Sequence, residues 1–150
     1  MKQLLSIFLI VILGACQTKK GKIIFYIENG SEVDSLINIK VFISESIRID
    51  TVFKYSTITP NYDTFVVEEP INDSILISAS TNTGANRQFK IKFNKDAYVF
   101  LTYVHDSVTT EKQRKAIKKM MKDHNGNDPS LLLEKKAIRE KVEYTEPILY

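Results

Sequence analysis

The sequence predicts a mainly β protein, a seven-stranded antiparallel β-sandwich with a C-terminal amphipathic helix and an extended tail. Two observations predict the sandwich. Between residues 22 and 104 apolar side chains alternate with polar ones, and turn-forming residues interrupt this pattern about every 8–12 residues. A third observation concerns the remainder of the chain. After residue 109 the apolar spacing changes to three and four, which indicates a helix.

The expected strands begin with the apolar run 23–27, which the turn-forming pair Asn29-Gly30 ends. Residues 37–43 and 47–53 then alternate, with β-branched residues on a core face and polar residues on a solvent face. The remaining strands are expected at residues 62–68, 75–79, 89–93 and 97–104. The last of these is apolar on both faces apart from one threonine, which predicts a central strand.

The N-terminal residues are typical of a secretory signal. Lys2 gives a positive start, and Leu4 to Leu13 is an apolar run interrupted only by Ser6. Ten helical residues rise only about 15 Å, which is too short for a bilayer core of about 30 Å. The run therefore indicates the hydrophobic region of a cleaved signal peptide and not a membrane span.

The apolar run ends in Leu13-Gly14-Ala15-Cys16, and Cys16 is the one cysteine of the sequence. This motif resembles the lipobox of bacterial lipoproteins. The resemblance implies cleavage before Cys16, a diacylglyceryl thioether on its sulfur and a further acyl group on the new amine. Gln17, which follows, is not acidic, and this implies the outer membrane, facing the periplasm. The alternative is a buried cysteine after an ordinary signal.

The domain organisation follows from the anchor and the change of period. We expect a signal peptide at 1–15, a lipidated tether at 16–21, the β-sandwich at 22–108 and a helical or extended extension packed on it at 109–150. A tether of about five residues reaches only about 15–18 Å, so the domain is expected to lie close to the membrane.

The tether region is also basic. Three lysines lie there, Lys19, Lys20 and Lys22. Anionic head groups would attract each of them by about 1 kcal/mol. The alternative is a solvated polar linker.

Composition excludes several functions. Once Cys16 carries lipid, no thiol remains for a disulfide, a thiolate metal site or a nucleophile. The formal net charge of +3 falls to +2 when Lys2 leaves with the signal peptide. This small excess and a secreted location argue against nucleic-acid binding.

The strand pattern of residues 22–104 resembles the small transthyretin-like or carboxypeptidase-regulatory-like sandwiches of bacterial envelope proteins, and an immunoglobulin-like sandwich is the alternative. The enzymes among transthyretin relatives end in Tyr-Arg-Gly-Ser. This chain instead ends in Pro147-Ile148-Leu149-Tyr150. The resemblance therefore implies a fold and no activity.

The expected helix can start with a capping box formed by Thr110 and Gln113 and stop at Asn125-Gly126. Its apolar stripe consists of Ala116, Ile117, Met120, Met121 and His124. Its basic face consists of Lys112, Arg114, Lys115, Lys118, Lys119 and Lys122. The helix either lays its stripe on the sandwich or rests its basic face on an anionic membrane or a partner. The candidate contact residues for the second arrangement are Lys112, Lys115, Lys118, Lys119 and Lys122.

The tail, residues 129–150, fits two structures. A helix would align Leu131, Ile138, Val142 and Thr145. A strand would place on one face Ile138, Glu140, Val142 and Tyr144. The glutamate fits poorly on a core face, so we expect a helix to about residue 134 and an extended stretch after it.

Catalytic and metal sites are not expected. His105-Asp106-Ser107 has the residue types of a catalytic relay, but adjacent residues point apart. The other histidine, His124, is expected at a helix end. Asp, Asn and Glu residues stand at positions 1, 3, 5 and 12 of an EF-hand loop, namely Asp123, Asn125, Asn127 and Glu134. Asp128 replaces the glycine of position 6, which favours a solvated loop. No cofactor other than the lipid is expected.

Five tyrosines of the sandwich region can either form a ligand platform or pack within the fold, namely Tyr26, Tyr55, Tyr62, Tyr98 and Tyr103. We therefore expect a non-enzymatic envelope lipoprotein, bound to the membrane by its lipid, that binds an envelope protein, a peptide strand or a glycan. One alternative is an inhibitor or immunity-type lipoprotein. Another is a hydrolase or lyase whose carboxylate pair is assembled by folding.

Overall fold

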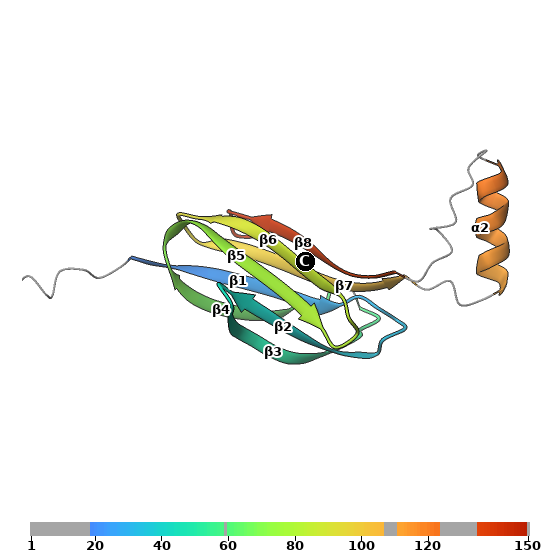
Figure 1. The fold of residues 1–150 in the computed structure, drawn as a ribbon, viewed down its shortest axis with the longest axis horizontal. Helices are drawn as coiled ribbons and strands as arrows, with labels where there is room; N and C mark the ends of the chain where they lie inside the picture. Colours follow the sequence, from blue (N-terminus) through green and yellow to red (C-terminus); the bar gives the residue numbers. More distant parts are fainter. Residues whose placement is uncertain (1–18, 59, 107–110, 124–134, 150) are drawn as a thin grey trace, which may run out of the picture.

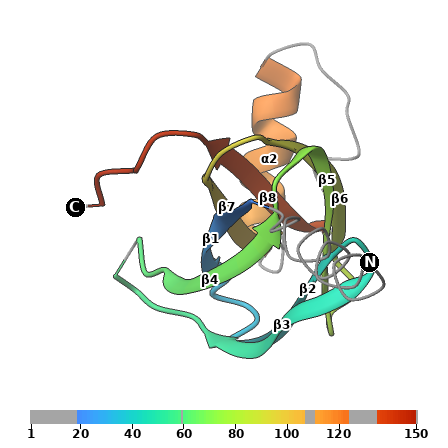
Figure 2. The same ribbon diagram turned by 90° about the vertical axis from the view of Figure 1, so that its left-hand side faces the viewer.

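The computed structural model describes residues 19–58, 60–106, 111–123 and 135–149. Within them, eight strands form two four-stranded sheets packed face to face, and one helix lies outside the sheets (Figures 1 and 2). Sheet A consists, in spatial order, of β4 (Asp63–Pro70), β1 (Lys20–Asn29), β7 (Ala97–Asp106) and β8 (Lys135–Glu143). Sheet B consists of β3 (Ser46–Lys54), β2 (Leu36–Ile43), β5 (Asn72–Thr81) and β6 (Asn86–Phe93).

The pairing is antiparallel except between β1 and β7, which run parallel, with Ile23 beside Ala97 and Asn29 beside Tyr103. Both strands therefore start at the same end of the sandwich. We call this the anchor end, because Lys20, the first residue of β1, lies only four positions after Cys16. The opposite end, where β1 and β7 finish, is the distal end.

The core lies between the two sheets. Every second residue of each central strand points inward, as the period of two predicts. The largest fully buried side chains include Phe25, Ile27, Ile39, Phe53, Ile77, Phe93, Leu101 and Tyr103. Each fully buried apolar side chain of this size contributes about 1.5–3 kcal/mol.

An ion pair crosses between the sheets at each long side of the sandwich. On one side Arg48 Nη2 of β3 lies 2.6 Å from Glu69 Oε1 of β4. On the other side Arg87 of β6 pairs with Glu140 of β8. A hydrogen bond 3.0 Å long from Lys92 N to Tyr144 Oη supports the second side.

The prediction of seven strands is wrong, because there are eight, and the helix is not C-terminal. Strand β8 follows the helix and pairs with β7 from Tyr98–Glu143 to Asp106–Lys135. It covers what would otherwise be an open edge of the apolar strand β7. The sandwich therefore continues beyond residue 108, and the stretch with two possible structures is a strand from residue 135 to 143.

Helix α2 (Glu111–Asp123) has the expected helical structure. Figure 1 shows it apart from both sheets, beyond the distal end. Met121 is its one buried residue, Ile117 is half-buried, and Met120 is exposed. All of its lysines are exposed. The expected cap at Thr110 and the expected stop at Asn125-Gly126 lie outside the described residues.

Candidate functional site

The two outer faces of the sandwich differ in chemistry. Sheet B shows water a mixed face, on which Leu36, Phe42, Ile47, Val52 and Leu76 lie between the polar groups. Its polar residues are Asn38, Lys40, Asp50, Ser78, Ser80, Gln88 and Lys90. Some of them bond to one another, as Asn38 Nδ2 does to Asp50 Oδ1 over 2.9 Å. This is the ordinary pattern for a solvated sheet face.

The outer face of sheet A is apolar and aromatic over its centre. In the pairing register of β4, β1 and β7, three residues lie side by side, namely Val66, Ile24 and Tyr98. The next row contains Tyr26, Phe100 and Lys141. The third row contains Glu28, Thr102 and Arg139. The relative exposure of Val66 is 59%. An antiparallel sheet with a solvated outer face does not need this apolar band, so the band needs another explanation.

Three aromatic rings form the centre of this face. Tyr26 stacks on Phe100 with ring centroids 4.9 Å apart. Tyr62, from the segment that leads into β4, meets both rings edge to face, at 6.2 Å from Tyr26 and 5.5 Å from Phe100. Such pairs each contribute about 0.5–1.5 kcal/mol beyond their buried area. The cluster is therefore a rigid floor.

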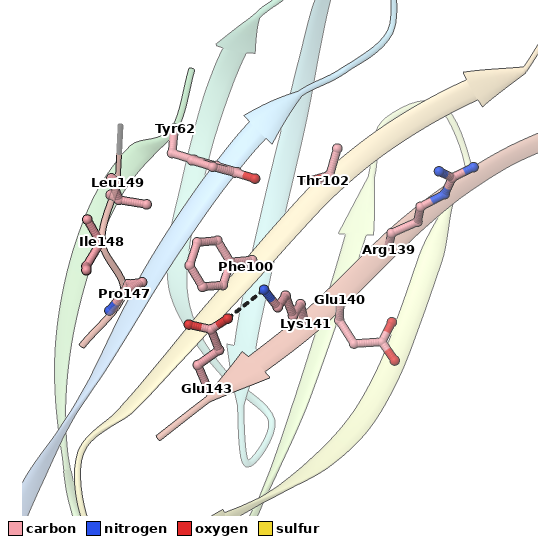
Figure 3. A pocket seen from close by; sticks show the side chains of 10 residues that line it. All are labelled: Tyr62, Phe100, Thr102, Arg139, Glu140, Lys141, Glu143, Pro147, Ile148 and Leu149. Atoms are coloured by element: carbon pink, nitrogen blue, oxygen red, sulfur yellow. Dashed lines mark ion pairs between the residues drawn. The ribbon is translucent and has the colours of Figure 1, made fainter. Parts of the chain in front are cut away.

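A groove of about 450 Å³ lies on this floor (Figure 3). Its lining residues are Tyr62, Phe100, Thr102, Arg139, Glu140, Lys141, Glu143, Pro147, Ile148 and Leu149. The floor comes from β7 and Tyr62, one wall from β8, and the other wall from the extended segment 147–149. Ile148 and Leu149 expose 75% and 49% of their surface, although they contribute to this wall. The groove is thus open to a partner along its length.

The wall formed by β8 carries paired charges. Lys141 Nζ lies 2.5 Å from Glu143 Oε1 and 5.7 Å from the centroid of the Phe100 ring, a cation–π contact. The hydrogen bond to Glu143 raises the pKa of Lys141. On the floor, burial and the neighbouring Glu28 raise the pKa of Tyr62, so its hydroxyl stays protonated at neutral pH. The groove therefore offers aromatic surface with hydroxyl and charged groups at its sides.

A second cluster of polar groups lies at the distal end. The side chain of Asn29 shapes the loop after β1, because its Nδ2 donates to Asp34 O over 2.6 Å and its Oδ1 accepts from Ser31 N over 3.0 Å. The loop brings Asp34 Oδ2 to 2.6 Å from Tyr103 Oη and 2.6 Å from His105 Nδ1.

Asp34 is held as a carboxylate in this cluster. Burial alone would raise its pKa, but the hydrogen bonds from Tyr103 and His105 and the positive charge of Lys136 outweigh burial and lower the pKa. The Asp–His pair resembles the base of a catalytic triad in composition only. His105 Nε2 is buried, so no substrate can reach the atom that a general base would use. The cluster is structural.

The structure distributes the residues singled out in the sequence among several places. Tyr26, Tyr62 and Tyr98 lie on the aromatic face of sheet A, whereas Tyr103 is buried. Tyr55 donates its hydroxyl to Glu32 over 3.0 Å, away from the groove.

The proposed contact lysines Lys112, Lys115, Lys118, Lys119 and Lys122 all lie on α2 and not at the groove. Cys16, His124 and three residues of the EF-hand-like loop (Asn125, Asn127 and Glu134) lie outside the described residues, as does Ser107. Among the residues that are described, no group of three or more His, Cys, Asp or Glu side chains converges as a metal site. No helix in this part of the chain is long and apolar enough to cross a membrane.

Sequence reasoning did not find two parts of the site. Phe100 lies in a strand that is apolar on both faces, so its exposure could not be read from the alternation. Arg139 and Lys141 lie in the stretch for which the sequence allowed two structures, and their position in a groove depends on the pairing of β8 with β7. The only local signal was the apolar ending of the chain after Pro147.

A scan against protein-family models and searches of curated proteins and of solved structures give no match for this chain. The geometry of the groove and the chemistry of the surface therefore carry the functional assignment. Of the surfaces described, the outer face of sheet A is the one that combines three aromatic rings in mutual contact with a groove.

Proposed function

We propose that this protein is a lipid-anchored, non-enzymatic binding module of the bacterial cell envelope, and that its groove takes an extended apolar segment of an envelope protein. One observation carries the choice of ligand. The chain's own segment 147–149, extended and rich in apolar side chains, already lies beside the aromatic floor formed by Tyr62 and Phe100. Ile148 and Leu149 remain 75% and 49% exposed beside this floor, so an apolar segment of a partner that enters the groove would bury them together with the two rings.

The chemistry of the groove suits a peptide. Aromatic rings pack against aliphatic side chains, and the polar residues Thr102, Arg139 and Glu143 line the same groove. Recognition of a glycan needs an accessible ring face for stacking. Here Tyr26 covers one face of Phe100, and Lys141 lies over the ring. This arrangement favours a protein segment over a sugar.

The lipid anchor at Cys16 remains a proposal from the sequence. The motif Leu13-Gly14-Ala15-Cys16 supports it. Two or three acyl chains give a stable anchor, whereas one gives only marginal attachment. A partner on the same membrane would gain effective concentration from such an anchor.

We also propose that the sandwich is transthyretin-like and not immunoglobulin-like. In a constant-type immunoglobulin domain the first two strands share one sheet. Here β1 belongs to sheet A and β2 to sheet B, and β1 pairs in parallel with β7. This strand order supports the envelope sandwiches as the nearer architecture.

The hydrolase alternative has less support. Glu140 and Glu143 line the groove, but each is paired with a cation. A glycosidase-type pair needs one carboxylic acid whose pKa is raised. The pKa values of Asp34 and Asp50 are both lowered, that of Asp50 mainly by the hydrogen bond from Asn38, and neither residue lines the groove.

A site-specific photo-crosslinking experiment in intact cells tests the proposal. A photoreactive amino acid replaces Thr102 in the groove or, as the control, Lys90 on the polar face of sheet B. We expect one dominant protein adduct from position 102 and none from position 90. Phe100→Ala should abolish the adduct, whereas Phe42→Ala, which removes a half-buried ring from the other outer face, should leave it intact.

Each other outcome counts against a specific part of the proposal. Equal adducts from both positions would contradict a groove-specific ligand, and adducts to glycan alone would contradict a peptide. A trapped enzyme whose activity falls on binding would establish the inhibitor alternative. If wild-type protein is absent from the membrane fraction, or Cys16→Ala stays there, the lipid anchor is wrong.

A further inference from the structure

A second hollow, of about 340 Å³, lies at the anchor end. Its lining residues are Lys19, Lys20, Ile71, Asn94, Lys95, Asp96, Tyr98, Tyr144 and Glu146. They come from four places: the start of β1, the link between β4 and β5, the turn between β6 and β7 with the start of β7, and the stretch after β8. We call it the anchor-end pocket.

The pocket is built on fixed backbone. Ile71 N donates to Lys19 O over 2.9 Å, which ties the chain before β1 to the link between β4 and β5. Lys22 N donates to Asp96 Oδ1 over 2.8 Å, which ties β1 to the turn before β7. Among the described residues, Lys19 is the one nearest in sequence to Cys16, and the first of these hydrogen bonds holds it. Three peptide units separate the two residues.

This short separation decides where the pocket lies relative to the lipid. Three residues span at most about 11 Å when extended. If Cys16 carries lipid, the pocket must lie within about this distance of the head groups, because Lys19 lines it. The pocket and the anchor are then at the same place on the membrane surface.

The side chains of the pocket match such a surface. Three lysines face two carboxylates, Asp96 and Glu146, and the first of these already accepts a backbone hydrogen bond. Tyr98 and Tyr144 add amphipathic rings of the type enriched at membrane interfaces. Lys95 Nζ lies 5.9 Å from the ring of Tyr144, so its ammonium is positioned at the mouth over an aromatic face. Burial and the neighbouring Glu146 raise the pKa of Tyr98, which keeps its hydroxyl available as a donor.

We propose that the anchor-end pocket binds the phosphate-bearing head group of an anionic lipid, and that Lys19, Lys20 and Lys95 hold it while the sandwich stands end-on on the membrane. This inference rests on the proposed lipid anchor. The anchor supplies attachment, and the pocket supplies orientation. Each lysine near an anionic surface strengthens the contact by about fivefold.

End-on attachment has a consequence for α2. Strands β1 and β7 run parallel from the anchor end, and α2 lies beyond the end of β7. A ten-residue strand is about 33 Å long, so the basic residues of α2 lie far from the leaflet that holds the lipid. Their partner is then not this leaflet. This separates the function of α2 from that of the tether lysines.

The test uses the lipidated protein, purified from membranes and reconstituted into vesicles of phosphatidylcholine, with or without about one third phosphatidylglycerol. Amide hydrogen exchange of residues 94–98 is compared with that of residues 31–35 in the distal loop. We expect exchange at 94–98 to slow several-fold in the anionic vesicles, with no change at 31–35. The double variant Lys20→Gln/Lys95→Gln should remove the effect. Its matched control, Lys54→Gln/Lys90→Gln, should retain it.

The outcomes distinguish the two proposals. Recovery of the protein in both vesicle types tests the anchor alone, because neutral vesicles give the pocket no anionic ligand. Equal exchange in the two vesicle types, with the protein recovered in both, would overturn the head-group site and leave the anchor in place. The same slowing on addition of inorganic phosphate to neutral vesicles would identify a free-phosphate site and overturn the lipid assignment.

Discussion

The guanidinium of Arg87 on β6 meets the carboxylate of Glu140 on β8, and this contact joins the two sheets along one side of the sandwich. The hydrogen bond from the arginine to Glu140 raises the pKa of Arg87. Glu140 lies in the inward row of β8 between Ile138 and Val142. The charge of Glu140 is tolerated in this row because the residue lies at the edge of sheet A, where Arg87 of sheet B can pair with it.

A double-mutant cycle measures the interaction free energy between Arg87 and Glu140. We expect Arg87→Met and Glu140→Gln each to lower the free energy of unfolding, with a coupling of about 0.5–1 kcal/mol, because both side chains are partly exposed to solvent. Urea unfolding of the two single variants and the double variant measures it. Lys40 and Asp50, an ion pair within the polar outer face of sheet B, give the control cycle, and their coupling should be smaller. A coupling of zero in the first cycle would contradict a role for the pair in joining the sheets.

Glu140 also explains where the sequence was informative and where it was not. Short apolar runs and alternation of apolar with polar residues predicted the first seven strands. Their ends were less predictable. The strand expected at residues 62–68 continues through Glu69 and Pro70, which pair with Gly21 and Lys20. The eighth strand was ambiguous because Glu140 has its partner 53 positions away. A local sequence pattern cannot identify a partner that lies so far away along the chain.

The candidate site was less predictable than the fold, for a similar reason. The five tyrosines were a candidate platform from the sequence, and of them only Tyr62 lines the groove. Phe100, Lys141 and the segment 147–149 meet only because β8 pairs with β7. The register between strands that are distant in sequence decides this arrangement. Alternation within a single strand does not reveal that register.

Strand β8 should be essential for folding. Truncation after Ser107 removes it and exposes the edge of β7, a strand whose Val99 and Leu101 are fully buried. We expect loss of cooperative unfolding, together with aggregation, because a long apolar edge is open to pairing. Truncation after Thr145 is the control, since it removes only the extended stretch, and it should unfold cooperatively. Thermal unfolding followed by circular dichroism compares the two. A cooperative transition in the shorter chain would contradict this prediction.

The turn between β2 and β3 is strained and can be improved. Ser44 and Glu45 have φ values of 46° and 73°, both in the left-handed region. A two-residue hairpin of this kind favours Asn-Gly. We therefore expect Ser44→Asn/Glu45→Gly to raise the free energy of unfolding by about 0.5–1 kcal/mol, because the new residues adopt positive φ at less cost.

Urea unfolding of the turn variant against wild type measures this gain. The control is Ser35→Gly in the loop after β1, an exposed position that lacks positive φ. Glycine there adds only freedom to the unfolded chain, so stability should fall or stay unchanged. An equal gain from both variants would show that relief of backbone strain is not the cause.

Acid sensitivity should depend on Asp34. Its pKa is lowered in the folded protein from the usual 3.8, because the hydrogen bonds from Tyr103 and His105 outweigh the effect of burial. A carboxyl group with a lowered pKa adds stability above its unfolded pKa and loses it as the pH falls through the folded value. The free energy of unfolding should therefore decline below about pH 5. Asp34→Asn should lower it at neutral pH by about 1–3 kcal/mol and flatten the decline.

Urea unfolding between pH 3 and pH 7 measures both effects. Tyr103→Phe removes one of the two hydrogen bonds to the same carboxylate. It should move the acid transition to higher pH, but by less than the loss of both hydrogen bonds would. Asp50→Asn serves as the comparison, because the pKa of Asp50 is also lowered but its side chain lies on the exposed face of sheet B. It should change the pH profile far less, since an exposed carboxylate is screened by water. If the Asp34→Asn and Asp50→Asn variants had the same profile, the cluster around Asp34 would not be the source of acid sensitivity.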